Sequence, residues 1–242
     1  MSEKKPLTPE EIEVLKQRHI RSFSGRKGHI SEAQKRALAE IFPRYELAYA
    51  PGLLNFADLF GRTAPVVLEI GPGMGETSAA IAQAHPEVDF IACEVFPAGI
   101  GAYSLRLDAL GLENVRIVAH DAVDVVRDMI PEASLSGIHV FFPDPWRKAR
   151  HHKRRIIQPG FTRTLAERLS PGAYIHLATD WENYAEHMLE VLSGEPLLEN
   201  LHEGFSPVMA NPLAERPATK FQKRGENLGH AVFDLVFRRK AG

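Results

Sequence analysis

Cysteine is almost missing from this chain, since Cys93 is the single cysteine among 242 residues. One cysteine cannot form a disulfide within the chain, so the sequence predicts a protein of a reducing compartment. Long apolar runs are missing too, because no stretch approaches the ~18 consecutive apolar residues that cross a bilayer. The first residues also lack the apolar run of a signal peptide. We therefore expect a soluble, cytoplasmic protein without a membrane span.

A large net charge is also absent, and the formal value of −2 predicts no polyanionic partner by itself. Acidic residues, however, are missing from one long stretch. Residues 146–163 contain seven Lys or Arg, two His and no Asp or Glu. A run of one sign repels itself and needs a counter-charge, which favours phosphate contact over a solvated face. Shorter basic clusters lie within residues 21–27 and 216–224, and for the first of these a solvated face is the simpler interpretation.

From about residue 65, short apolar runs alternate with amphipathic stretches. The runs predict strands at residues 66–70, 90–95, 115–118, 138–142 and 173–178, which are rich in β-branched or aromatic side chains. The stretches between them predict helices at residues 76–84, 98–110, 122–129, 159–169 and 181–192. Five such alternations call for a parallel sheet with helices on both faces.

The two ends of the chain follow other patterns. Residues 230–237 alternate with period two after the last helix, which predicts an antiparallel strand, with residues 195–201 as a hairpin partner. An α/β sheet, mostly parallel and closed by a C-terminal antiparallel hairpin, is the class I methyltransferase (Rossmann-like) fold. Residues 1–60 predict an N-terminal extension that is polar and disordered at its start, with helical spacing at 10–21 and 31–39. Residues 61–242 form the expected methyltransferase domain.

A glycine-rich turn follows the first strand. Its glycines Gly71, Gly73 and Gly75 come directly after Glu69, in the spacing G-x-G-x-G. Glycine lets the backbone turn sharply and approach a ligand closely. A dinucleotide fingerprint G-x-G-x-x-G would have glycine where Glu76 stands, and this carboxylate would oppose a pyrophosphate. S-adenosylmethionine has no phosphate, so the spacing favours it over NAD as the cofactor.

Three acidic residues follow the next three strands. Glu94 can accept hydrogen bonds from ribose hydroxyls, a device that NAD enzymes share. Asp121 can face the adenine amine or cap the helix that starts at Ala122, and both roles remain open. Asp144 lies between two prolines in Phe-Phe-Pro-Asp-Pro-Trp, at the sheet edge where such folds bind ligands, although a proline-rich turn with a capping Asp is the alternative.

These motifs closely resemble those of the bacterial tRNA (guanine-N7)-methyltransferase family. The resemblance rests on Glu-Ile-Gly-Pro-Gly-Met-Gly at 69–75, Phe-Pro-Asp-Pro-Trp at 142–146, Lys148, His-His-Lys-Arg-Arg at 151–155, Ala-Thr-Asp-Trp at 178–181 and Arg-Pro-Ala-Thr-Lys-Phe at 216–221. The motifs stand in the family's order, from about Arg21 to the final strand. The resemblance implies methyl transfer from S-adenosylmethionine to N7 of a guanine in the variable loop of tRNA.

The resemblance also implies residue roles. It assigns cofactor contact to Glu69, Glu94, Asp121 and Asp144, beside the glycines of the turn, and makes Asp144 the catalytic residue. It assigns substrate contact to Lys148, Asp180, Thr219, Lys220, Phe221 and Gln222, and tRNA contact to the stretch 150–155 with Arg150, Lys153, Arg154 and Arg155. Family members often carry Glu where Gln222 stands, and glutamine accepts through one oxygen only. Asp180 is therefore the better candidate for the hydrogen-bonding edge of the guanine.

Other functions receive less support. His151 and His152 are adjacent, so they point to different faces, and no Cys or acidic ligand lies near them, so no metal site is expected. An NAD-dependent oxidoreductase on a doubly wound sheet and a non-catalytic RNA-binding module are the alternatives. The sequence leaves a monomer and a homodimer equally open.

Overall fold

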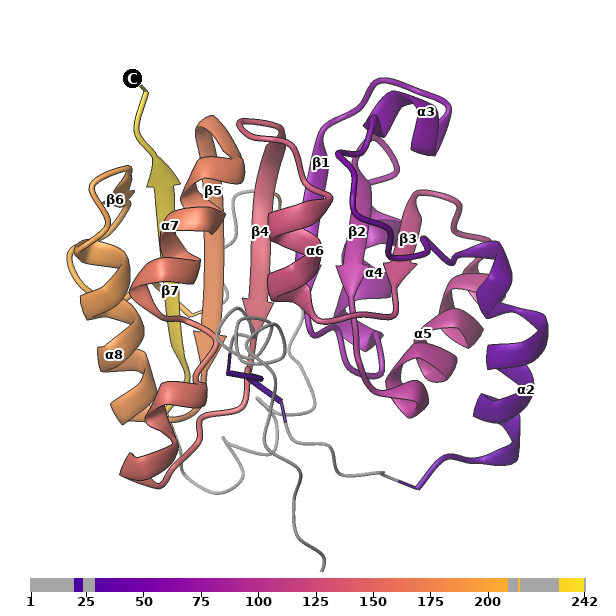
Figure 1. Ribbon diagram of the computed structural model, residues 1–242, viewed down its shortest axis with the longest axis horizontal. Helices are drawn as coiled ribbons and strands as arrows, with labels where there is room; N and C mark the ends of the chain where they lie inside the picture. The colour runs from indigo at the N-terminus through magenta and orange to yellow at the C-terminus, as the bar shows by residue number, and fades with distance from the viewer. Residues whose placement is uncertain (1–19, 24–28, 209–212, 214–230, 242) are drawn as a thin grey trace, which may run out of the picture.

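The computed structural model describes residues 20–23, 29–208, 213 and 231–241. In that part of the chain, seven strands form one sheet in the order β3-β2-β1-β4-β5-β7-β6 (Figure 1). The strands are β1 (Val66–Ile70), β2 (Asp89–Cys93), β3 (Val115–Val118), β4 (Leu135–Phe141), β5 (Leu169–Thr179), β6 (Leu198–Asn200) and β7 (Phe233–Arg239). Neighbouring strands from β3 to β5 are parallel, whereas β7 runs antiparallel to both β5 and β6.

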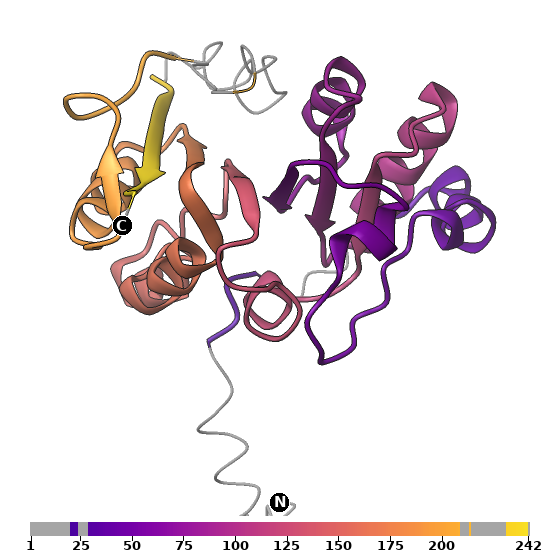
Figure 2. The same ribbon diagram turned by 90° about the horizontal axis from the view of Figure 1, so that it is seen from above.

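Helices cover both faces of the sheet (Figures 1 and 2). The helices of the main domain are α4 (Glu76–Ala84), α5 (Pro97–Leu110), α6 (Ala122–Asp128), α7 (Pro159–Arg168) and α8 (Glu182–Ser193). One apolar core lies between the sheet and α6, α7 and α8, and a second lies between the sheet and α4 and α5. Every residue of β1 is buried, because this central strand is covered from both sides.

Described residues before β1 pack against these helices and the sheet. Helix α2 (Glu32–Glu40) begins at Ser31 with a capping box formed with Gln34, and it lies along α5. Close approach is possible because Gly101 has no side chain, since a Cβ atom there would lie 2.6 Å from the Gln34 carbonyl oxygen. Two short helices follow, η1 (Phe42–Arg44) and α3 (Phe56–Phe60). Between them, Glu46 forms a parallel bridge with Ile117 at the end of the sheet.

The sequence predictions of a mostly parallel sheet and of the terminal hairpin are confirmed. The strands at 66–70 and 115–118 agree residue for residue, and β6 and β7 form the expected antiparallel pair. Strand β5 begins at Leu169 rather than near residue 173, because its first residue pairs with Leu135 across a register shift. The helical spacing at 10–21 falls mostly on residues outside the described part. Ile20 and Arg21 lie in no helix, and residues 10–19 lie outside the described part.

Within the described residues, none of the helices combines the length and the hydropathy that a membrane span requires.

Candidate active site

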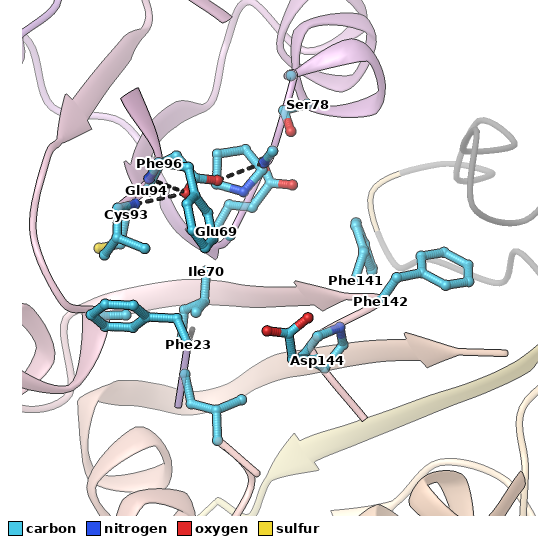
Figure 3. A pocket seen from close by; sticks show the side chains of 18 of the residues that line it. Phe23, Glu69, Ile70, Ser78, Cys93, Glu94, Phe96, Phe141, Phe142 and Asp144 are labelled. Carbon is cyan, nitrogen blue, oxygen red and sulfur yellow. Dashed lines mark hydrogen bonds between the residues drawn. The ribbon is translucent and has the colours of Figure 1, made fainter. Parts of the chain in front are cut away.

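One cavity opens at the carboxyl ends of the central strands. Its volume of about 570 Å³ is within the range of pockets that hold a nucleoside-sized ligand. All seven residues that the sequence assigned to the cofactor line it, namely Glu69, Gly71, Gly73, Gly75, Glu94, Asp121 and Asp144. Figure 3 shows Glu69 and Glu94 on one side of the cavity and Asp144 on the other. The fold therefore brings together side chains from β1, β2, β3 and β4.

The glycine turn needs its glycines for two different reasons. Gly71, Gly73 and Gly75 have φ angles of +74°, +59° and +72°, in the left-handed region that side chains disfavour. Gly75 has no room either, because a Cβ atom there would lie 2.1 Å from a ring carbon of Tyr103. Sequence reasoning missed a further glycine, Gly99 in α5, where a Cβ atom would lie 2.8 Å from the Gly73 carbonyl oxygen. The turn can therefore pack tightly on α5.

Glu94 connects the glycine turn to the end of β2. Its Oε2 accepts a hydrogen bond from the backbone N–H of Gly73 at 2.9 Å (Figure 3). Its Oε1 accepts from the N–H groups of Val95 and Phe96, at 2.7 and 2.9 Å. A carboxylate has about four lone-pair positions, so roughly one remains for a ligand hydroxyl. Burial raises the pKa of Glu94, and the three backbone donors counteract this.

Glu69 stands one residue before the end of β1 and is only 5% exposed. Burial raises the pKa of this carboxyl to about 7, and the nearby charge of Glu94 contributes in the same direction. Glu69 lines the cavity, so a cationic ligand group placed there would favour the ionised carboxylate.

Asp121 performs the capping role that the sequence left open. Its carboxylate accepts from the Val123 N–H at 3.1 Å at the start of α6, and it also lines the cavity. Beside it lies His120, a cavity residue that sequence reasoning missed. The His120 ring stacks on Tyr49, with ring centroids 3.8 Å apart and planes 6° apart. The Tyr49 hydroxyl is held by Asp128 at 2.6 Å, so this aromatic wall has a fixed orientation.

The loop that carries Asp144 is strained on both sides. Phe142 and Trp146 have φ angles of +51° and +46°, which are uncommon for bulky residues. Such strain persists only where the surroundings determine the conformation. The Phe142 N–H donates to the Ala178 carbonyl oxygen at 2.7 Å, which extends the β4–β5 pairing into the loop. Asp144 itself is exposed and faces into the cavity (Figure 3).

A short segment from the N-terminal region also lines the cavity. Ser22 and Phe23 both contribute, although sequence reasoning gave neither a role there. The Trp146 indole N–H donates to the Ser22 carbonyl oxygen at 2.8 Å, and Arg154 donates to the Phe23 carbonyl oxygen at 2.7 Å. The Arg154 guanidinium lies 3.9 Å from the centre of the Trp146 ring. The segment is thus held by the loop that follows Asp144.

The basic run, residues 146–163, contains both exposed and internal side chains. Lys148, Arg150 and Lys153 are exposed on and next to the short helix η2 (Ala149–Arg154). Arg154 is half-buried in the contacts described above. Arg155, to which the resemblance also assigned tRNA contact, is 3% exposed and hydrogen-bonded inside the protein.

The remaining predicted substrate residues lie elsewhere. Asp180 follows β5 directly and is half-buried, but it does not line the cavity. Thr219, Lys220, Phe221 and Gln222 lie outside the described residues. No cluster of three or more His, Cys, Asp or Glu side chains among the described residues is arranged to hold a metal ion.

The cavity suits a cationic nucleoside better than a dinucleotide. Five carboxyl groups line it, from Glu69, Glu76, Glu94, Asp121 and Asp144, and no Lys or Arg is among the described residues that line it. A pyrophosphate would meet repulsion there, whereas the sulfonium and ammonium groups of S-adenosylmethionine would be attracted. Glu76 adds less to this preference than its sequence position suggests, because it pairs with Arg106 at 2.6 Å.

Solved structures with the same architecture define the class. The structure titled "Crystal Structure of 16S rRNA Methyltranferase KamB" matches with a TM-score of 0.55 and 17% identity, over 77% of this chain and 93% of that chain. The antibiotic-resistance methyltransferase Kmr matches with a TM-score of 0.52 and 13% identity, over 81% and 98%. These likenesses concern the fold. Together with the acidic cavity at the glycine turn, they define a class I S-adenosylmethionine-dependent methyltransferase.

Sequence relatives identify the family within this class. Residues 63–235 match the family model described as "Putative methyltransferase". The "tRNA (guanine-N(7)-)-methyltransferase" of Bordetella pertussis is 55% identical over 91% of this chain and 85% of its own length. Proteins of the same name from Nitrosospira multiformis and Aromatoleum aromaticum are 53% and 56% identical, over 96% and 92% of this chain and 99% and 85% of their own lengths. The chain belongs to the tRNA (guanine-N7)-methyltransferase family.

Proposed function

We propose that this chain transfers a methyl group from S-adenosylmethionine to N7 of a guanine in the variable loop of tRNA. The products are 7-methylguanosine in the tRNA and S-adenosylhomocysteine. One observation carries the proposal: Asp144 faces the acidic cavity from a loop that continues directly into the exposed basic residues Lys148, Arg150 and Lys153. Catalytic and RNA-binding groups are therefore adjacent along the chain, and the relatives' shared name supports the same activity.

The chemistry requires little proton transfer. When bound, S-adenosylmethionine supplies an electrophilic methyl carbon, so that the N7 lone pair forms the new bond while the S–C bonding pair returns to sulfur. Guanine N7 carries no proton at neutral pH, and no side chain has to remove one. The chain's own residues must instead hold guanine N7 in line with the donor methyl carbon. They must also stabilise the positive charge that the purine acquires.

Asp144 is suited to the second task. Its carboxylate is at the rim of the cavity, where a base entering from solvent would meet it. A fixed negative charge at that place favours the cationic purine over the neutral one. The strained residues Phe142 and Trp146 hold the loop in a conformation that is ready before the substrate binds.

The tRNA would be held by groups around this rim. We assign the hydrogen-bonding edge of the guanine to Asp180, and further substrate contacts to Thr219, Lys220, Phe221 and Gln222. Lys148, Arg150 and Lys153 would contact backbone phosphates, because they are exposed cations next to the catalytic loop. A guanine in folded tRNA has to be exposed first, at a cost of a few kcal/mol. With tRNA as its substrate, we place the enzyme in the cytoplasm.

The decisive test uses tritiated S-adenosylmethionine with an unmodified tRNA transcript, digested to nucleosides after the reaction. We expect label in 7-methylguanosine, and we expect this label to disappear when the variable-loop guanine is replaced. Label in another nucleoside would contradict the assignment of the target atom.

An Asp144→Asn variant should still bind S-adenosylhomocysteine while its kcat falls by about a hundredfold. Unchanged turnover in this variant would remove Asp144 from the catalytic role.

A further inference from the structure

Arg155 is the buried member of the basic run. Its side chain is 3% exposed, whereas Arg150 and Lys153 in the same run are exposed. A buried guanidinium is costly unless its donors are satisfied, and burial lowers the pKa of Arg155 accordingly. This arginine therefore cannot serve as a phosphate contact without leaving its present partners.

Its partners come from two separate parts of the fold. Arg155 Nε donates to the Pro145 carbonyl oxygen at 3.0 Å. Its Nη2 donates to Asn183 Oδ1 at 2.7 Å, and its Nη1 donates to the Asn183 carbonyl oxygen at 3.4 Å. Its Nη2 also contacts His152 Nε2 at 3.1 Å, where the ring nitrogen must accept because a guanidinium has only donors. The guanidinium lies 4.7 Å from the centre of the Tyr184 ring.

These partners connect the two acidic residues of the proposed reaction. Pro145 directly follows Asp144 in the strained loop after β4, and Asn183 lies in the first turn of α8, three residues after Asp180. The planar guanidinium bonds to both segments at once, with donors in a fixed fork geometry. It therefore fixes the catalytic loop relative to the start of α8.

We propose that Arg155 is a positioning residue that sets the placement of Asp144 relative to Asp180, and that it does not bind tRNA. This inference rests on the proposed function, in which the two carboxylates act on the same guanine. Lysine cannot replace the arginine, because an ammonium group offers donors from a single point and lacks the planar fork. Asn183 accepts the hydrogen bonds through which Arg155 is connected to the start of α8, so it belongs to the same connection.

The test separates positioning from RNA binding through the division between kcat and KM. In Arg155→Lys and in Asn183→Ala, we expect kcat to fall by about tenfold or more, while KM for tRNA and S-adenosylhomocysteine affinity stay within about twofold. Combining the two changes should cost little more than Arg155→Lys alone, because both break one connection. Lys153→Ala is the matched contrast in the same run, and there we expect a higher KM for tRNA.

Asn183→Ala is the milder of the two variants, since Asn183 is exposed, its replacement leaves no buried cavity, and Arg155 Nη2 keeps its contact with His152. A raised KM with intact kcat in Arg155→Lys would overturn the inference in favour of phosphate contact. Unchanged kcat in a folded Asn183→Ala variant would overturn it as well.

A second readout does not depend on activity. The chain has two tryptophans, so in a Trp181→Phe background the fluorescence reports Trp146 alone, within the loop that Arg155 holds. We expect acrylamide to quench Trp146 more strongly after Arg155→Lys or Asn183→Ala, and equal quenching would contradict the positioning role. The proposed function is tested separately, by identifying the nucleoside that the unsubstituted enzyme labels in tRNA. That result does not involve Arg155.

Discussion

The carboxyl groups of the cavity differ in their surroundings more than in their chemistry. Glu94 accepts three backbone hydrogen bonds and so organises the glycine turn. Glu69 is buried, and burial raises its pKa to about 7. Asp144 is exposed at the rim. At the scale of single residues, burial and hydrogen-bond donors therefore decide which carboxyl has its pKa raised to about 7, which one organises the glycine turn and which one stays exposed at the rim.

Glu69 should make the folded state sensitive to pH. Burial raises its pKa from 4.5 to about 7, so the folded chain keeps this proton to higher pH than the unfolded chain does. Stability linked to this group is present at low pH and is lost as the pH rises through about 7. In Glu69→Gln, which stays neutral, the free energy of unfolding relative to the parent should improve by on the order of 2 kcal/mol between about pH 5 and about pH 8. Urea unfolding at both pH values measures it, and a difference independent of pH would contradict the prediction.

The glycine turn offers a matched pair of substitutions. Gly71 and Gly75 both have positive φ angles, but only at Gly75 would a Cβ atom collide with Tyr103. We expect Gly71→Ala to cost about 1 kcal/mol of unfolding free energy from backbone strain. Gly75→Ala should cost about 1–3 kcal/mol more, because strain and overpacking combine. Urea unfolding of both variants is the measurement, and equal losses would show that Tyr103 moves aside freely.

At the scale of elements, Asp121 tests whether one side chain serves two purposes. It caps α6 through Val123 and also lines the cavity. Asp121→Asn keeps a side-chain oxygen for the cap, so the unfolding free energy should change by less than about 0.5 kcal/mol. The second carboxylate oxygen and the charge are lost, and we expect S-adenosylhomocysteine to bind several-fold more weakly by calorimetry. Undiminished affinity would leave Asp121 with the capping role alone.

The positions of the strands and helices could be predicted from the sequence better than their first and last residues could. Strand β1 was predicted to the residue because it is rich in β-branched residues and a glycine turn follows it directly. Strand β5 was predicted too short, because the predicted strand at 173–178 leaves out Pro171 and Gly172, which the observed strand contains. The sheet tolerates them because the pairing of β4 with β5 shifts register between Leu135 and Gly137. Such a shift depends on the partner strand and is invisible in the local pattern.

At the scale of the whole molecule, charge placement should determine how tRNA binding responds to salt. The exposed cations Lys148, Arg150 and Lys153 are available to phosphates, and the buried Arg155 is not. Removing one phosphate contact lowers the slope of log affinity against log salt concentration by about 0.7–0.9.

We expect a change of this size for Lys148→Ala, Arg150→Ala and Lys153→Ala, and an unchanged slope for Arg155→Gln, which also removes one positive charge. Filter binding or fluorescence titration of tRNA at several salt concentrations measures these slopes. A reduced slope in Arg155→Gln would place that side chain on the RNA, contrary to its burial in the free protein.

The sequence by itself determined the alternation of strands and helices, the glycine turn and the carboxylates Glu69, Glu94, Asp121 and Asp144. These features are local, because periodicity, turn chemistry and strand ends can be read from a few neighbouring residues. The tertiary structure alone decided that Phe23 lines the cavity and that Arg155 turns inward among basic neighbours that stay exposed. Burial depends on which distant segments fold against a side chain, and the charge pattern of one segment carries no information about that.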